Sequence, residues 1–253
     1  MNRIIINGCC GRMGRFLMDM IGETEGMQVV AGIDPFIPEG TDFGFPVYTS
    51  LDKAIEEADV VIDFSIASGV PSLLESVKKK GLGIVVATTG LDEDTRQLLR
   101  EASKSVPVFF SANMSLGINL LKELIKKTAE VLGKDYDVEI IEKHHKMKKD
   151  APSGTALALA DALREVRDFQ YVYGRKETEK ARAEGELGIH AFRGGSIVGE
   201  HEVIFAGSNE VIEITHKAYS RELFARGAVR AAGYLKGKAP GFYSMEDMLS
   251  GEF

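Results

Sequence analysis

The stretch IIINGCCGRMG, residues 4–14, decides how the amino-terminal half of this 253-residue chain folds. An apolar run from Arg3 to Asn7 ends in glycines spaced GxxGxxG, and a helical stretch from Arg12 to Ile21 follows. The run is typical of a parallel strand covered on both faces. Glycines allow a tight turn, and the helix start offers N–H groups and a positive dipole end to a phosphate. The stretch predicts a dinucleotide-binding loop, although glycine spacing alone also fits an ordinary turn.

Further apolar runs follow, with helical stretches between most of them. Val70 to Lys80 is expected to be helical because Pro71 lies in its first turn and Gly81 just beyond its end. Alternating strands and helices predict an α/β fold, a Rossmann-like doubly wound parallel sheet whose ligands bind at the carboxyl ends of the strands. The later expected strands are residues 28–33, 59–64, 83–87 and 106–110.

Asp34 ends the second expected strand. A carboxylate at this place can accept hydrogen bonds from the ribose hydroxyls of a dinucleotide and would repel a 2′-phosphate. The next residue is Pro35, not an arginine that would bind the phosphate, although Arg12 in the glycine loop could reach it. NADH is therefore the favoured cofactor, with NADPH usable. The alternative is that Asp34 only starts the turn before Pro35.

The second half changes character. It predicts an α+β domain with a mostly antiparallel sheet, inserted before the last helices of the chain. The nucleotide-binding domain is expected to comprise residues 1–114 and 221–253, and the substrate-binding and oligomerisation domain residues 115–220. The second domain is expected to contain a helix ending at residue 133, a strand at 138–142, a hairpin formed by 202–205 and 211–216, and a polar loop over the site at 173–188.

The stretch KHHKMKKDAPSGTA, residues 143–156, concentrates positive charge in a chain whose net charge is -7. Ser153 is a natural cap for the helix that follows, and the open amides at that helix start form an anion site beside the lysines. The histidines and Lys148 could supply a proton to a bound acid. A solvated basic turn is the alternative. A metal is not expected on His144 and His145, because adjacent strand residues point to opposite faces and no ligand cluster completes a set.

Composition narrows the class of protein. The acidic balance argues against nucleic-acid binding, and no apolar run approaches the roughly 20 residues that span a bilayer. The two cysteines are neighbours and cannot build a disulfide framework, which favours a reducing cytoplasm.

The same motifs resemble those of the dihydrodipicolinate reductase family. EKHHKMKKDAPSGTA matches every specified position of the family motif E-x-H-H-x-x-K-x-D-A-P-S-G-T-A, and GCCGRMG, ATTG, SANMSLGIN, RGGSIVGEHEV and ITHKAYSR extend the match over essentially the whole chain. Ala87, where the family usually has glycine, and Pro35 depart from the pattern.

The resemblance implies an NAD(P)H-dependent oxidoreductase of diaminopimelate and lysine biosynthesis. The enzyme would transfer a hydride to a cyclic imine dicarboxylate, giving tetrahydrodipicolinate. It also implies a homotetramer joined through the second domain's sheet. Closure of the two domains around the ligands is a separate hypothesis, because the expected binding groups lie on separate domains. The implied site comprises the catalytic residues His144 and Lys148; the substrate-binding residues His145, Ser153, Gly154 and Thr155; and the cofactor-binding residues Gly8, Cys9, Cys10, Gly11, Arg12, Met13, Asp34, Ala87, Thr88, Thr89, Ser111, Ala112, Asn113 and Met114.

Two other classes share part of the pattern. Another two-domain amino-acid-pathway dehydrogenase, acting on aspartate semialdehyde or homoserine, would share the front half. The semialdehyde type needs a nucleophilic cysteine in its second domain, and no cysteine follows Cys10. A dinucleotide-sensing regulator would bind the cofactor without oxidising it and would leave the acid/base stretch without a role.

Overall fold

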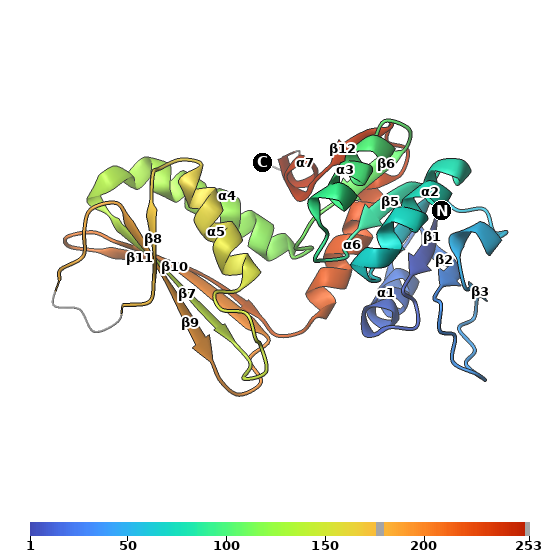
Figure 1. Cartoon of the computed structure of the whole chain (residues 1–253), viewed down its shortest axis with the longest axis horizontal. Coiled ribbons are helices and arrows are strands. Elements are labelled where there is room, and N and C mark those ends of the chain that lie inside the picture. Colours follow the sequence, from blue (N-terminus) through green and yellow to red (C-terminus); the bar gives the residue numbers. More distant parts are fainter. Residues whose placement is uncertain (176–179, 251–253) are drawn as a thin grey trace. The chain divides into compact units, whose positions relative to one another are not determined.

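The computed structural model of the chain describes residues 1–175 and 180–250. The chain divides into two compact units (Figure 1). Unit 1 consists of Met1–Leu116 and Glu222–Phe253, and unit 2 of Gly117–Arg221. The expected boundaries after residue 114 and before residue 221 lie close to these.

Unit 1 is built on a parallel sheet. The strand order is β12-β6-β5-β4-β1-β2-β3. From β1 the chain first adds β2 and β3 on one side, and then adds β4, β5, β6 and β12 on the other side. The strands are β1 (Asn2–Asn7), β2 (Met27–Ile33), β3 (Val47–Tyr48), β4 (Val60–Asp63), β5 (Gly83–Val86), β6 (Pro107–Phe110) and β12 (Gly241–Tyr243).

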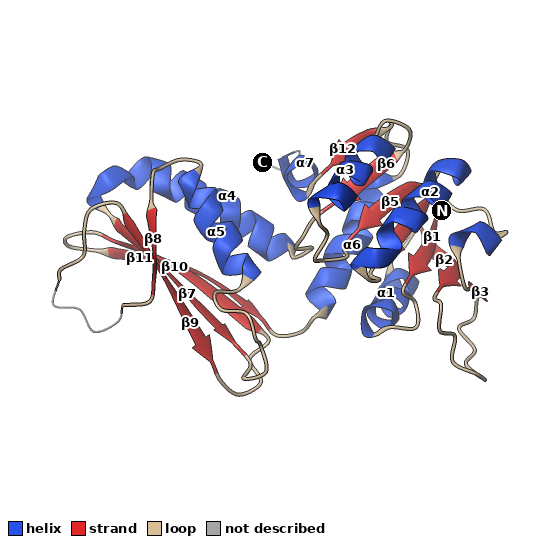
Figure 2. Ribbon diagram, viewed as in Figure 1, coloured by secondary structure: helices blue, strands red, loops and turns tan. Residues whose placement is uncertain are grey.

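Helices cover both faces of this sheet (Figure 2). Ile4 and Ile6 pack in one buried cluster with α1 and α6, whereas Ile5 packs in a second cluster with α2 and α3. The alternation follows from the two-residue period of a strand. The helices are α1 (Arg12–Glu23), α2 (Val70–Lys80), α3 (Glu93–Ala102), α6 (Glu222–Leu235) and α7 (Met245–Leu249), with short 3₁₀ turns at Leu51–Lys53 and Ala67–Gly69.

The Rossmann-like fold expected for the first half is confirmed. α2 has the expected bounds, with Pro71 in its first turn and Gly81 in the left-handed conformation at φ 66° just past its end. α6 returns to unit 1, as predicted. These elements were predictable because each has a local start or stop signal.

Unit 2 pairs a five-stranded sheet with two helices on one face. The sheet has the order β11-β10-β7-β9-β8, and α4 and α5 pack over it around a core that includes Ile140, Val203 and Phe205. The elements are α4 (Leu116–Leu132), a 3₁₀ turn (Gly133–Asp135), β7 (Asp137–His144), α5 (Gly154–Arg164), β8 (Gln170–Tyr173), β9 (Glu186–Arg193), β10 (Gly199–Ala206) and β11 (Val211–Ala218).

The second sheet is mixed, not mostly antiparallel as expected. The predicted hairpin of β10 and β11 is antiparallel, and so is the β7–β10 pair, but β9 runs parallel to both β7 and β8. The sequence prediction missed β8 and β9 because their residues do not alternate cleanly. The expected loop at 173–188 is shorter, since β8 includes Tyr173 and β9 begins at Glu186. Its central residues, 176–179, lie outside the described residues.

No helix among the described residues combines the length and the apolar character needed to cross a membrane.

Candidate active site

The glycine loop between β1 and α1 has backbone geometry that only glycine permits at two positions. Gly8 has φ 84°, and a Cβ there would lie 2.6 Å from the carbonyl oxygen of Phe64. A Cβ on Gly14 would lie 2.3 Å from the carbonyl oxygen of Cys9, so α1 packs directly against the loop. The first turn of α1 contains no acidic residue. Its free N–H groups can therefore bind an anion such as a pyrophosphate.

A cavity of about 520 Å³ opens beside this loop. Its lining includes Asn7 at the end of β1, Gly8 after it, Asp34 after β2, and Ser65 after β4. Because β1 lies between β4 and β2 in the sheet, this place is the point where the strand order reverses. Open α/β sheets bind dinucleotides at such a point.

The Asp34 carboxylate is held in a fixed orientation at the edge of this cavity. It accepts a hydrogen bond from the N–H of Cys10 at 3.1 Å and another from the N–H of Phe36 at 3.0 Å. Each carboxylate oxygen keeps a second lone pair for another donor. The arrangement suits two ribose hydroxyls.

Asp63 links the ends of three strands and was not singled out from the sequence. The side chain is fully buried and accepts from Asn7 Nδ2 at 2.7 Å, Ser65 Oγ at 2.6 Å and Thr88 Oγ1 at 2.7 Å. Burial raises the pKa of Asp63, although these hydrogen bonds oppose the shift. The Thr88 hydroxyl, predicted as a cofactor contact, is thus bonded within the protein, where it ties the segment after β5 to the end of β4.

Several other predicted cofactor residues are buried. Cys9, Ala87 and Met114 are at most 6% exposed and belong to the core cluster under α1 and α6. Contact between these residues and a cofactor stays a prediction. Because the side chains are buried, the contact would have to come from main-chain atoms. Ser111 donates from Oγ to the carbonyl of Asn113, which shapes the loop after β6.

In unit 2, a buried carboxylate organises the predicted acid/base residues. Glu142 is 0% exposed. Arg193 on β9 donates to both of its oxygens, at 2.7 and 2.6 Å, His144 Nδ1 lies 2.6 Å from Oε2, and the Ser153 N–H donates to Oε1 at 2.9 Å. Burial alone would raise the pKa of Glu142, but these hydrogen bonds lower it overall. Glu142 is therefore an anion at neutral pH.

His144 and His201 are both neutral near pH 7. Burial lowers the pKa of His144, and Lys148 and Arg193 lower it further, although Glu142 opposes the shift. Burial lowers the pKa of His201 to about 3. Because Glu142 is an anion, the proton of neutral His144 lies on Nδ1, which donates it to the Glu142 carboxylate. The other ring nitrogen, Nε2, is left as a hydrogen-bond acceptor. Gly199 leaves space beside this atom, since a Cβ there would lie 3.1 Å from it.

Lys148 lies in the loop between β7 and α5. Its Nζ pairs with Asp150 Oδ2 at 2.9 Å, and its side chain is 22% exposed. Arg193 also donates to the Asp150 carbonyl at 2.6 Å, so the guanidinium that holds Glu142 holds this loop as well. The loop therefore places an ammonium group close to the buried Glu142–His144 pair.

The helix α5 begins at Gly154, directly after Ser153. Ser153 caps the helix, its Oγ accepting from the Ala156 N–H at 3.1 Å, and lies 3.0 Å from His201 Nε2. A Cβ on Gly154 would meet nothing within 4 Å. The space beside the Gly154 main chain, at the start of the helix, is therefore open. His145 is half-buried beside this loop.

Three residues of this cluster were missed from the sequence. Glu142, Arg193 and His201 lie inside the matching stretches EKHHK and RGGSIVGEHEV, but no role was predicted for them. Their place inside these matching stretches was the signal that could have found them. Their partnership becomes visible only when β7 pairs with β9 and β10.

Sequence models of one family match both units of the chain. The model described as "Dihydrodipicolinate reductase, N-terminus" matches residues 2–114, and the model described as "Dihydrodipicolinate reductase, C-terminus" matches residues 117–249.

Individual relatives agree with this match. The chain is 52% identical to the 4-hydroxy-tetrahydrodipicolinate reductase of Caldanaerobacter subterraneus subsp. tengcongensis, over 98% of each chain. It is 46% identical to that of Clostridium tetani, over 99% of this chain and 98% of the relative. A solved structure, a dipicolinate-bound dihydrodipicolinate reductase from Paenisporosarcina sp. TG-14, is similar in fold, with a TM-score of 0.81 at 24% identity over 98% of each chain.

Proposed function

The chain belongs to the dihydrodipicolinate reductase family, and we propose that it reduces 4-hydroxy-tetrahydrodipicolinate to tetrahydrodipicolinate with a reduced nicotinamide dinucleotide. The observation that carries this proposal is the assembly around Glu142. It brings a neutral histidine, an ammonium group and an open helix start together in one unit. The family's reaction needs a proton donor and anion-binding groups of this kind.

The reaction balances with one hydride and one proton. When bound, the reduced dinucleotide supplies a hydride from C4 of its nicotinamide ring. The substrate, a cyclic imine with two carboxylates, loses water, accepts the hydride and takes up the proton. The oxidised dinucleotide and tetrahydrodipicolinate are the products.

The residues around Glu142 take distinct roles in this proposal. The amides of Gly154 and Thr155 at the start of α5, together with His145, bind a substrate carboxylate. Lys148 donates the proton to the electron-rich product of hydride addition. His144, oriented by Glu142, accepts a hydrogen bond at Nε2 and acts with Lys148 in moving protons. Arg193 is a positioning residue, since its donors are directed to Glu142 and the loop.

A direct assay tests this function. Absorbance of the reduced nicotinamide is followed with freshly prepared 4-hydroxy-tetrahydrodipicolinate, with NADH and NADPH compared. Oxidation that depends on the substrate is expected. Dinucleotide binding without any oxidation would contradict the proposal and favour a dinucleotide-sensing regulator.

We expect the cofactor preference to depend on Asp34. Asp34→Asn removes a carboxylate that would accept hydrogen bonds from the ribose hydroxyls and repel a 2′-phosphate. The ratio of kcat/KM with NADH to kcat/KM with NADPH should therefore fall by about 10- to 100-fold, which corresponds to the free energy of a hydrogen bond to a charged group. The measurement is kcat/KM with each cofactor. Asp52→Asn is the matched control, because Asp52 lines the same cavity but is exposed. An equal effect of both variants would show that general charge, not the position of Asp34, sets the preference.

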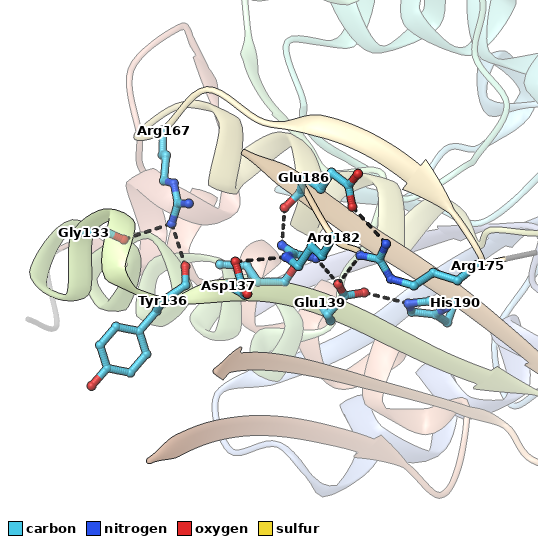
Figure 3. A network of polar contacts seen from close by, with 10 residues as sticks. Gly133, Tyr136, Asp137, Glu139, Arg167, Arg175, Arg182, Glu186 and His190 are labelled. Atoms are coloured by element: carbon cyan, nitrogen blue, oxygen red, sulfur yellow. Dashed lines mark hydrogen bonds and ion pairs between the residues drawn. The ribbon is translucent and has the colours of Figure 1, made fainter. Parts of the chain in front are cut away.

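We also propose that copies of the chain associate as a homotetramer through the face of the second sheet that α4 and α5 leave uncovered. Figure 3 shows a polar network on this face, in which Glu139 accepts from Arg175 at 2.9 Å, lies 2.7 Å from His190 Nε2 and also pairs with Arg182. Phe192 lies on the same face of the sheet and is 52% exposed. An exposed aromatic side chain beside charge pairs is typical of a protein interface.

Phe192→Asp tests the assembly. We expect the wild-type chain to sediment at four times the mass of one chain and the variant to shift toward smaller species, because a carboxylate would be desolvated in the interface. Analytical ultracentrifugation measures both. Phe242→Asp, at a 41% exposed phenylalanine of unit 1, is the control and should keep the wild-type mass. A monomeric wild-type chain would refute the tetramer.

A further inference from the structure

Two adjacent thiols lie in the dinucleotide loop, and the turn itself does not require them. Cys9 and Cys10 are the only cysteines of the chain. Cys9 is fully buried and Cys10 is half-buried. The loop geometry depends on Gly8 and Gly14, whereas Cys9 packs in the buried cluster under α1 and α6 and Cys10 packs against that cluster.

The distance between the two sulfur atoms fits a shared metal ion. They lie 3.9 Å apart, whereas a disulfide requires about 2.05 Å. In a tetrahedral zinc site with Zn–S distances of about 2.3 Å, two thiolates lie about 3.8 Å apart. The spacing therefore matches two ligands of one ion.

Asp34 provides a third ligand beside the thiols. One ligand atom each of Cys9, Cys10 and Asp34 lies within 4.8 Å of the other two. Gly32 makes room for this arrangement, because a Cβ there would lie only 2.6 Å from Cys9 Sγ. Gly32 and Asp34 are two residues apart and so point to the same face at the end of β2.

We propose that Cys9, Cys10 and Asp34 bind a thiophilic divalent cation, Zn²⁺ or Cd²⁺, with water as the fourth ligand, and that this ion excludes the dinucleotide. Two thiolates and a carboxylate are ligands that such ions take, and three protein ligands plus water form a common zinc geometry. Exclusion follows because an ion bound to one Asp34 oxygen occupies the lone pair that one of the two ribose hydroxyls would use. This second part rests on the dinucleotide site proposed above, whereas cation binding does not.

A cation that binds the two cysteines as thiolates displaces their protons to the solvent.

Titration of the metal-free protein with Cd²⁺ tests the site. Because the chain has no other cysteine, ultraviolet thiolate-to-cadmium absorbance reports on this pair alone. We expect saturation at one ion per chain. Cys10→Ser and Asp34→Asn should each weaken binding by roughly tenfold or more, since even loss of a group that only orients a ligand costs about that much. Asp52→Asn, the matched carboxylate control, should bind Cd²⁺ like the wild type.

Two outcomes would overturn the site. One is the absence of thiolate absorbance, and the other is saturation at one ion per two chains, which would mean bridging between molecules. Exclusion is measured separately, as the rise in the apparent Kd for Cd²⁺ at saturating NADH. Thiolate absorbance with an unchanged Kd would disprove exclusion alone. Failure of the metal-free protein to bind NADH would instead refute the proposed dinucleotide site.

Discussion

Lys148→Ala is expected to lower kcat by about 10²- to 10⁴-fold, the usual contribution of a general acid. Lys148 is the ammonium group that the loop between β7 and α5 holds beside Asp150 and close to the Glu142–His144 pair. Removing it leaves the product of hydride addition without its proton donor. His144→Ala should reduce kcat by a similar factor, because the acceptor at Nε2 is lost.

The measurement is steady-state kcat together with the Kd for NADH. The Kd should stay unchanged in both variants, since the glycine loop and Asp34 are untouched. Lys149→Ala is the matched control, because Lys149 is the exposed neighbour in the same loop. Wild-type turnover in Lys148→Ala would remove this lysine from the mechanism, and a loss in Lys149→Ala of equal size would indicate a general effect of positive charge.

Arg193→Ala is expected to destabilise the fold by about 3–5 kcal/mol, the cost of leaving a buried charge without its partner. Glu142 is 0% exposed and receives both guanidinium bonds from Arg193. The measurement is the free energy of unfolding in urea. Arg100→Ala is the control: Arg100 pairs with Glu93 at 4.0 Å with both side chains exposed, and such pairs contribute about 0–1 kcal/mol.

The effect of Arg193 should depend on pH in a defined direction. The pKa of Glu142 is lowered in the folded protein, so the stability from this group is present above its unfolded pKa and is lost as the pH falls through its folded pKa. The difference between wild type and Arg193→Ala should therefore shrink in acid. The double variant Glu142→Gln with Arg193→Met should recover most of the loss at neutral pH, because no buried charge remains. A difference that stays constant down to strongly acidic pH would show that Arg193 acts through packing.

Local signals explain what could be predicted of the fold. The positive φ of Gly8, the proline and glycine that bound α2, and the Ser153 cap are signals that neighbouring residues in the sequence set. By contrast, β9 has no clean alternation of apolar and polar residues. Its parallel pairing with β7 follows from two long connections, the one through α5 and the one after β8. A two-residue turn would have made these strands antiparallel.

The sequence by itself determined the fold of the nucleotide-binding half, the position of His144 and Lys148 before a capped helix, and the family. Each of these follows from residues that are contiguous in the chain. Only the tertiary structure decided that Arg193 neutralises Glu142 across 51 residues, and that the Cys9 and Cys10 thiols meet Asp34 across 24 or more. The physical reason is that strand register sets which distant side chains share a face. Burial then makes a charge depend on that partner, and neither register nor burial can be read from a local stretch.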